Sequence, residues 1–320
     1  MNRTYVGWGA LALVAAAMLT VPAFNDRYML FVAYFLALNV ALAQSWNLVG
    51  GYSGLVSLGH AAFFGLGAYA AAVAVNFLSV PIAVSILVGG LVAAAAAVAV
   101  SFLTFRFLGI YFAIGTLVLA EALRLWMVNW ELLGGAQGMQ FPIHASLSVS
   151  TFYYIMLALA VGATAAVMLI VPSRLGFALR AMRDNEESAQ NLGVNLFRTK
   201  LTAFVISAFI AGLVGAAHAN RLGHIEPYSI FSASWTIGIV NIVIIGGIGT
   251  IVGPVVGAVF VALMSEYLAD YASLHLVIEG LLLILIIRFM PYGIWGFVQR
   301  LPRWIAGTSA GRRATDPEKV

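Results

Sequence analysis

The sequence contains no cysteine. Disulfides, thiolate catalysis, zinc–cysteine sites and iron–sulfur clusters are therefore excluded. The five histidines show no HExxH or other short metal-ligand spacing, so no metal site is predicted. A GxSxG nucleophile elbow is absent as well, and no clustered catalytic set is present, so the sequence predicts no catalytic residue and no enzyme.

Charged residues are also scarce, at 9% of 320 residues against 62% hydrophobic residues. A soluble domain carries roughly a quarter charged residues, so this chain could not cover a water-facing surface. A membrane-spanning helix needs about 20 apolar residues, which gives on the order of ten spans. The composition predicts an all-α polytopic membrane protein and disfavours a cytosolic enzyme, a secreted protein or a nucleic-acid binder. The net charge of +4 then reflects positively charged cytoplasmic loops rather than an anionic partner.

Long apolar runs bounded by polar or Gly/Pro clusters give the crossings. The clear crossings are predicted at 7–23, 29–48, 55–76, 82–103, 108–128, 152–171, 201–220 and 275–290. The first 24 residues also resemble a signal peptide, but an uncleaved first span is favoured because the whole chain is apolar.

The run 236–262 decides the topology. It contains the glycines of 246–250 and then Gly253-Pro254, which should interrupt a helix. Splitting it into two short helices, about 236–247 and 255–270, gives ten crossings instead of nine. The split is favoured because both termini, including a basic tail at about 297–320, and 13 of the 16 lysines and arginines then lie in the cytoplasm.

Two glycine clusters occupy corresponding places in the two halves, GGYSGLVSLGHAAFFGLG at 50–67 and GGIGTIVGPVVG at 246–257. Glycine-interrupted segments of this kind point to a transport site. Close helix packing explains the glycines equally well. The candidate residues of a translocation pathway are Gln44, Asn47, Gly50, Gly51, His60, Asn241, Gly246, Gly247 and Glu279.

Few charges within the spans are available to couple transport to an ion gradient. Glu121 and Arg124 lie three residues apart and are predicted to form a structural ion pair. Glu279 has no nearby basic residue in sequence and is the best single candidate for a functional intramembrane charge. The chain has no GxxxxGK[ST] loop, so the energy for any pumping comes from a partner or from an ion gradient.

The segment 172–200 is the only long polar stretch within the apolar body. Asp184-Asn185 is expected to cap a short helix, with Glu186 and Glu187 in its first turn, where the helix dipole favours acids. Gly193 is expected to end that helix. Two interpretations stay open, a solvated loop helix and a helix that docks into a soluble partner.

Glu187-Ser188-Ala189, three further residues and Gly193 approximate the EAA-x3-G loop of ABC importer permeases, although Ser replaces the first Ala and the usual I-x-L-P is absent. Four longer blocks carry a wider resemblance: SWNLVGGYSGLVSLGHAAFFGLGAYAAA (45–72), GFALRAMRDNEESAQNLGVN (176–195), IIGGIGTIVGPVVGA (244–258) and RFMPYGIWG (288–296). Over nearly its whole length the chain resembles the LivM-type permeases of branched-chain amino acid ABC importers.

The resemblance implies a single permease domain, 1–320, in a bacterial inner membrane. Its partners would be a LivH-type permease, two ABC ATPase subunits and a periplasmic substrate-binding protein. ATP and Mg would bind to the ATPases, and this chain would bind no cofactor. Leu, Ile or Val would be moved by ATP-driven alternating access.

Coupling to the ATPases would run through the 183–193 helix. The motif positions carried over are Glu187, Ser188, Ala189 and Gly193, with Arg183, Asp184 and Glu186 as flanking contacts. The alternatives are a related permease for urea, amides or other amino acids, and an ion-coupled secondary carrier.

Overall fold

The computed structural model describes residues 2–24, 26–107, 109–142, 147–268, 272–290 and 292–299. The longer helices are α1 (Asn2–Leu19), α2 (Arg27–Trp46), α3 (His60–Leu78), α4 (Ile82–Thr104), α5 (Ile110–Val128), α6 (Val149–Ile170), α9 (Leu196–Leu222), α11 (Ala233–Gly246), α12 (Gly253–Tyr267) and α13 (Ala272–Phe289). The shorter elements are η1 (Val21–Phe24), η2 (Asn47–Gly51), η3 (Glu131–Leu133), η4 (Gly135–Gln137), β1 (Met139–Gln140), α7 (Arg174–Asp184), α8 (Glu186–Asn191), β2 (His224–Ile225) and α10 (Pro227–Ile230).

The prediction of a polytopic helical membrane protein is confirmed. Among the described residues, nine helical segments are long and apolar enough to cross a membrane, and α12 is a further, shorter apolar helix. The predicted break in 236–262 is confirmed too, because α11 ends at Gly246 and α12 begins at Gly253. Two starting points are wrong by five residues: the third crossing begins at His60 rather than near residue 55, and α9 begins at Leu196 rather than near residue 201. Residues 52–59 instead form a loop that turns at Gly54, whose φ is 76°.

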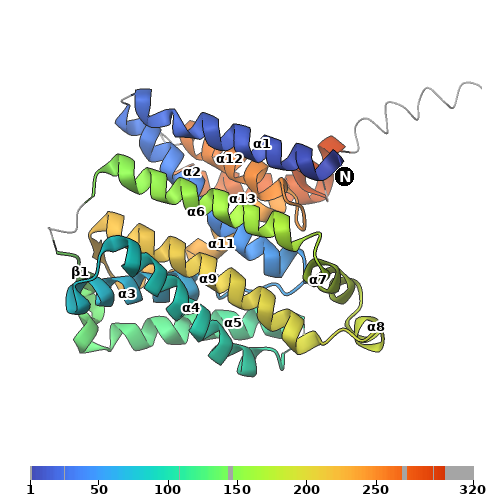
Figure 1. Cartoon of the computed structure of the whole chain (residues 1–320), viewed down its shortest axis with the longest axis horizontal. Coiled ribbons are helices and arrows are strands. Elements are labelled where there is room, and N and C mark those ends of the chain that lie inside the picture. Colours follow the sequence, from blue (N-terminus) through green and yellow to red (C-terminus); the bar gives the residue numbers. More distant parts are fainter. Residues whose placement is uncertain are drawn as a thin grey trace, which may run out of the picture.

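The helices run between two ends of the bundle (Figure 1), with α7 and α8 at one end and β1 at the other. We call these the α8 end and the β1 end. At the β1 end, β1 pairs antiparallel with β2, and the side chain of Asn76 donates to the carbonyl of Gln140 at 3.0 Å. This small sheet lies in the loops that follow α5 and α9, and it joins the ends of α3 and α9.

The centre of the bundle is the contact of α3, α4 and α9, where small residues let the backbones approach. A side chain on Gly67 of α3 would overlap the carbonyl oxygen of Gly212 in α9. On Gly89 of α4, a Cβ would lie 2.6 Å from the Cβ of Ala216. Packing of this kind is the usual basis of helix association in membranes.

Candidate functional site

The polar segment between α6 and α9 folds into two helices rather than one. Ser173 caps α7 by accepting from the backbone N–H of Gly176 at 3.5 Å. Asn185 then leaves the helical conformation, at φ −162°, and its side chain accepts from Ser188 N–H at 2.8 Å to cap α8. The predicted cap and the predicted stop are confirmed, since α8 ends before Gly193, which has φ 88°. The sequence did not predict α7.

α8 is held to the bundle along one side only. Lys200 of α9 forms an ion pair with Glu186 across 2.7 Å, and Ala189 is buried against the bundle. Because the Lys200 side chain is itself buried, this pair fixes the position of α8. The opposite side of α8 carries exposed Glu187 and Ser188, and Leu192 just beyond the helix is 83% exposed.

Arg183, in the last turn of α7, is an exposed residue whose guanidinium reaches the end of α2. Its guanidinium Nη1 donates to the carbonyl oxygen of Gly51 across 2.6 Å. A side chain on Gly249 would overlap the same Nη1 and would lie 3.0 Å from the oxygen of Gly51. Three segments far apart in the sequence therefore meet at the α8 end.

The two amides that precede the first glycine cluster tie it to the second. Asn47 donates through Nδ2 to the carbonyl of Thr250 at 2.8 Å and accepts through Oδ1 from Gly249 N–H at 2.9 Å. Gln44 donates to the carbonyl of Ile251 at 2.8 Å. We call this meeting of Gln44, Asn47, Gly51, Arg183 and residues 246–251 the glycine junction. Gly50 lies next to it, and a Cβ on Gly50 would overlap the ring of Trp46.

Gly246 and Gly247 complete the junction. Gly246 packs directly on the backbone of Gly253, so the ends of α11 and α12 are in contact. A Cβ on Gly247 would lie 3.1 Å from the carbonyl of Tyr292, just after α13. The structure thus brings Gly51, at the start of the first glycine cluster, against the second cluster at the α8 end.

His60 lies in a buried polar cluster between α2, α3 and α9. The hydroxyl of Ser45 donates to the carbonyl of Ser207 at 2.8 Å, and the hydroxyl of Ser207 donates to the carbonyl of Ser45 at 2.7 Å. Since both hydroxyl protons are used, His60 Nε2–H is the donor to Ser207 Oγ across 2.8 Å. The cluster clamps α2 to α9, and neither serine was singled out from the sequence.

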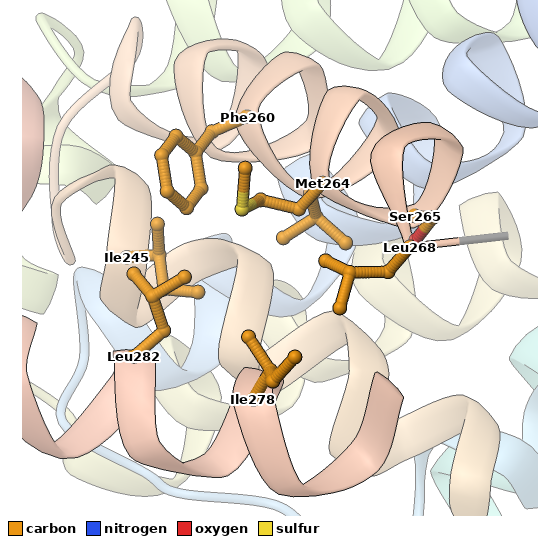
Figure 2. A pocket seen from close by; sticks show the side chains of 8 residues that line it. Ile245, Phe260, Met264, Ser265, Leu268, Ile278 and Leu282 are labelled. Carbon is orange, nitrogen blue, oxygen red and sulfur yellow. The ribbon is translucent and has the colours of Figure 1, made fainter. Parts of the chain in front are cut away.

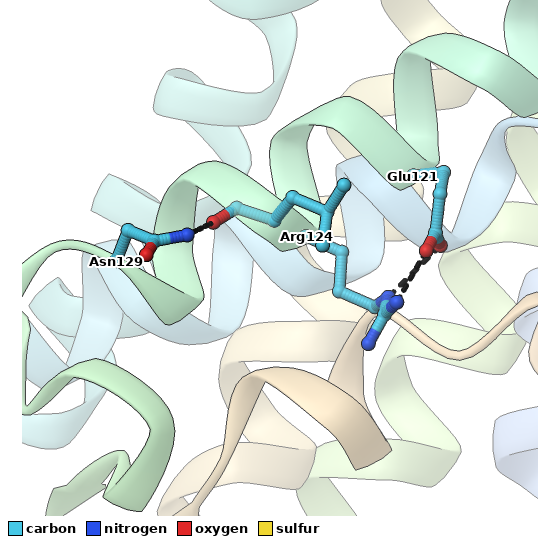
Figure 3. Close-up of polar contacts among 4 residues, drawn as sticks. Glu121, Arg124 and Asn129 are labelled. Atoms are coloured by element: carbon cyan, nitrogen blue, oxygen red, sulfur yellow. Dashed lines mark hydrogen bonds and ion pairs between the residues drawn. The ribbon is translucent and has the colours of Figure 1, made fainter.

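The predicted ion pair on α5 is present (Figure 3). Arg124 Nε donates to Glu121 Oε2 across 2.8 Å, and a second contact joins Arg124 Nη2 to Glu121 Oε1. Arg124 also lies over the ring of Tyr228, 4.9 Å from its centroid. Of the remaining pathway candidates, Asn241 lies in α11, more than one helical turn before Gly246. The side chain of Glu279 lies outside the described residues.

An apolar cavity of about 20 Å³ lies between α11, α12 and α13. Its lining side chains, among them Phe260, Met264 and Ile278, point toward one another and leave little space between them (Figure 2). A space of this size holds roughly one water molecule, so this cavity is too small for an amino acid.

The geometry defines a class of protein: a membrane helix bundle that presents a short polar segment at one end and joins it to the ends of its spans. A polytopic permease has this organisation. The chain matches the family described as branched-chain amino acid transport system, permease component, over residues 28–287.

Individual relatives agree with that match. The high-affinity branched-chain amino acid transport system permease protein LivM of Salmonella typhimurium is 28% identical, over 95% of this chain and 78% of its own length. LivM of Escherichia coli is also 28% identical, over 95% of this chain and 79% of its own length. The permease protein LivH of Escherichia coli is 33% identical over 39% of this chain and 40% of its own length. No solved structure matches with significance. The chain belongs to the family of branched-chain amino acid transport permeases.

Proposed function

We propose that the chain is one of two permease subunits of an ATP-driven importer of leucine, isoleucine and valine. Its partners are a LivH-type permease, two ABC ATPase subunits and a periplasmic substrate-binding protein. The whole chain, 1–320, acts as one permease domain and binds no cofactor, while ATP and Mg bind to the ATPases. Family membership and the similarity to LivM proteins over 95% of the chain support this proposal.

The main observation behind the proposal is the way in which α8 is attached to the bundle and the residues that it leaves exposed. Glu186 and Ala189 hold the helix to the bundle, which leaves Glu187, Ser188 and Leu192 facing outward. An exposed acidic residue on a helix that is fixed to the bundle, with an exposed leucine just after that helix, would fit a shallow groove on a soluble subunit. Glu187, Ser188, Ala189 and Gly193 are the coupling positions in this proposal, and Asp184, exposed at the end of α7, flanks them.

The proposed orientation places the α8 end in the cytoplasm of a bacterium and the bundle in its inner membrane. The five basic residues of 172–200 lie at this end, together with Arg106. Loops rich in lysine and arginine stay in the cytoplasm during insertion. The N- and C-termini are then both cytoplasmic, and the β1 end faces the periplasm.

The proposed pathway runs beside the candidates Gln44, Asn47, His60, Asn241 and Glu279, and it closes at the glycine junction. The cavity between α11, α12 and α13 is too small to hold the solute. The solute therefore takes a path elsewhere than this cavity. Alternating access then consists of opening and closing the α8 end as the ATPases move α7 and α8.

Uptake into proteoliposomes tests the proposal. The complex that copurifies with the tagged chain is reconstituted with ATP inside and binding protein outside, and radiolabelled leucine is supplied. Uptake is expected to require ATP and to persist when ionophores collapse all ion gradients. Uptake driven by a proton or sodium gradient without ATP would instead establish an ion-coupled carrier. Competition by isoleucine and valine, but not by urea, acetamide or alanine, is expected; the reverse pattern would indicate a permease for those solutes.

A further inference from the structure

Arg183 makes a contact within this chain that docking of α7 and α8 onto an ATPase would not need. Gly51 is the last residue of η2, the π-helical segment that ends α2. Carbonyl groups at the end of a helix lack a partner within the helix, and a charged donor is among the strongest partners available to them. Arg183 supplies that donor to Gly51 from 132 residues further along the chain.

Gly249 leaves space for the same guanidinium because it has no side chain. Its φ of 72° lies in the left-handed region that favours glycine. A Cβ there would overlap Arg183 Nη1, so a residue with a side chain would displace the arginine from Gly51. The guanidinium therefore rests between the end of α2 and the loop that joins α11 to α12.

From this loop the connections continue into α12. Thr250 Oγ1 accepts from Gly253 N–H at 3.0 Å, at the start of α12. Asn47 binds the backbone of both Gly249 and Thr250. A displacement of Arg183 therefore acts on the ends of α2, α11 and α12 together, because hydrogen bonds join these ends.

We propose that Arg183 is the positioning residue that carries movement of the α7–α8 segment into the ends of α2 and of the α11–α12 hairpin. The inference rests on the proposed function, in which ATPase subunits move that segment. It gives Arg183 a role through its contact with Gly51 rather than through contact with an ATPase.

Arg180 provides a matched control one turn earlier on α7. Its Nε donates to the carbonyl of Gly176 at 3.2 Å and its Nη2 to that of Val171 at 3.1 Å. Both acceptors lie in or just before the same helix, so Arg180 makes no hydrogen bond to the glycine junction. Replacing either arginine with glutamine removes the same charge from the same helix.

The test measures leucine uptake and ATP hydrolysis together in the reconstituted complex, as moles of leucine moved per mole of ATP hydrolysed. Arg183→Gln is expected to lower this ratio at least tenfold while the ATPases continue to hydrolyse ATP. Arg180→Gln is expected to keep the ratio within twofold of wild type. Arg183→Lys, which keeps a charged donor, is expected to recover part of the ratio. A wild-type ratio in Arg183→Gln, or an equal loss in Arg180→Gln, overturns the inference.

A double-mutant cycle addresses the contact itself and does not depend on how much complex assembles. Gly249→Ala is expected to lower the same ratio by displacing the Arg183 side chain. Added to Arg183→Gln, it is expected to lower the ratio no further, because the contact is already lost. Independent, multiplying losses would overturn the inference.

If the proposed function itself were wrong, the wild-type chain would give a different experimental result. In that case the wild-type chain copurifies with no ATPase, or its uptake needs no ATP. A wild-type complex that couples uptake to ATP while Arg183→Gln behaves identically refutes only the role of Arg183.

Discussion

Asn47 is predicted to hold α2 to the α11–α12 hairpin, and Asn47→Ala measures how strongly. The side chain is fully buried and makes two hydrogen bonds, to Thr250 O at 2.8 Å and from Gly249 N at 2.9 Å. A hydrogen bond contributes about 1 kcal/mol net, and each polar group left buried without a partner costs about 1–3 kcal/mol. Since the truncation leaves a backbone donor and a backbone acceptor unpaired, the expected loss in free energy of unfolding is about 2–6 kcal/mol.

The assay is equilibrium unfolding of the purified chain in mixed micelles, titrated with sodium dodecyl sulfate and followed by helicity. Asn129→Ala is the matched control, because Asn129 is exposed and its Nδ2 bonds only to the carbonyl of Leu125 in its own helix, at 2.7 Å (Figure 3). That variant is expected to lose less than about 0.5 kcal/mol. A loss of the same small size in Asn47→Ala would refute the reasoning, because the glycine junction would then contribute nothing to stability.

Three further predictions follow from the packing, the orientation and the docking segment. Gly67→Ala is expected to lower the free energy of unfolding by about 1–3 kcal/mol or more, because the added Cβ would overlap the backbone of Gly212. Gly162→Ala is the control: it has open space around it and is expected to raise the free energy of unfolding by up to about 1 kcal/mol. Similar values for both variants would contradict the close packing of α3 on α9. Because the chain has no native cysteine, single cysteines can report the orientation. The exposed positions Leu192 and Leu132 serve for this: Leu192→Cys is expected to react with an impermeant maleimide only from the cytoplasm, and Leu132→Cys only from the periplasm. Labelling of both from one side would exclude the proposed orientation. Glu187→Lys reverses an exposed charge on α8, and Gly193→Ala puts a side chain at a φ of 88°, which favours glycine. Both variants are expected to insert into the membrane normally and to lower leucine uptake per ATP hydrolysed at least tenfold. Normal transport in both would contradict a coupling role for α8.

The spans were predictable because their signal is local. Each crossing needs a run of about 20 apolar residues, and such runs are visible without any knowledge of the fold. The break between α11 and α12 was predictable for a similar reason, since a run of glycines followed by Gly253-Pro254 disfavours one continuous helix. The cap of α8 at Asn185 also depends only on residues within one turn of it.

The glycine junction was not predictable, because its contacts join residues far apart in the chain. Nothing in the sequence pairs Arg183 with Gly51 or Asn47 with Gly249, and glycine is abundant throughout, at 32 residues. The amide of Asn47 was noticed as a polar group near a glycine cluster, but its partners are backbone groups that carry no sequence signal. The Ser45–Ser207 clamp was missed for the same reason, since isolated serines are common in membrane helices.

The identity of the proteins that surround this chain tests its role as an importer permease most directly. The tagged chain is extracted in mild detergent, affinity purified, and analysed with its companions by mass spectrometry. Recovery of a second permease of the same family together with P-loop ATPases is the expected result. Recovery of the chain alone, under conditions that keep a known ABC importer intact, would contradict the proposed function and favour an ion-coupled carrier.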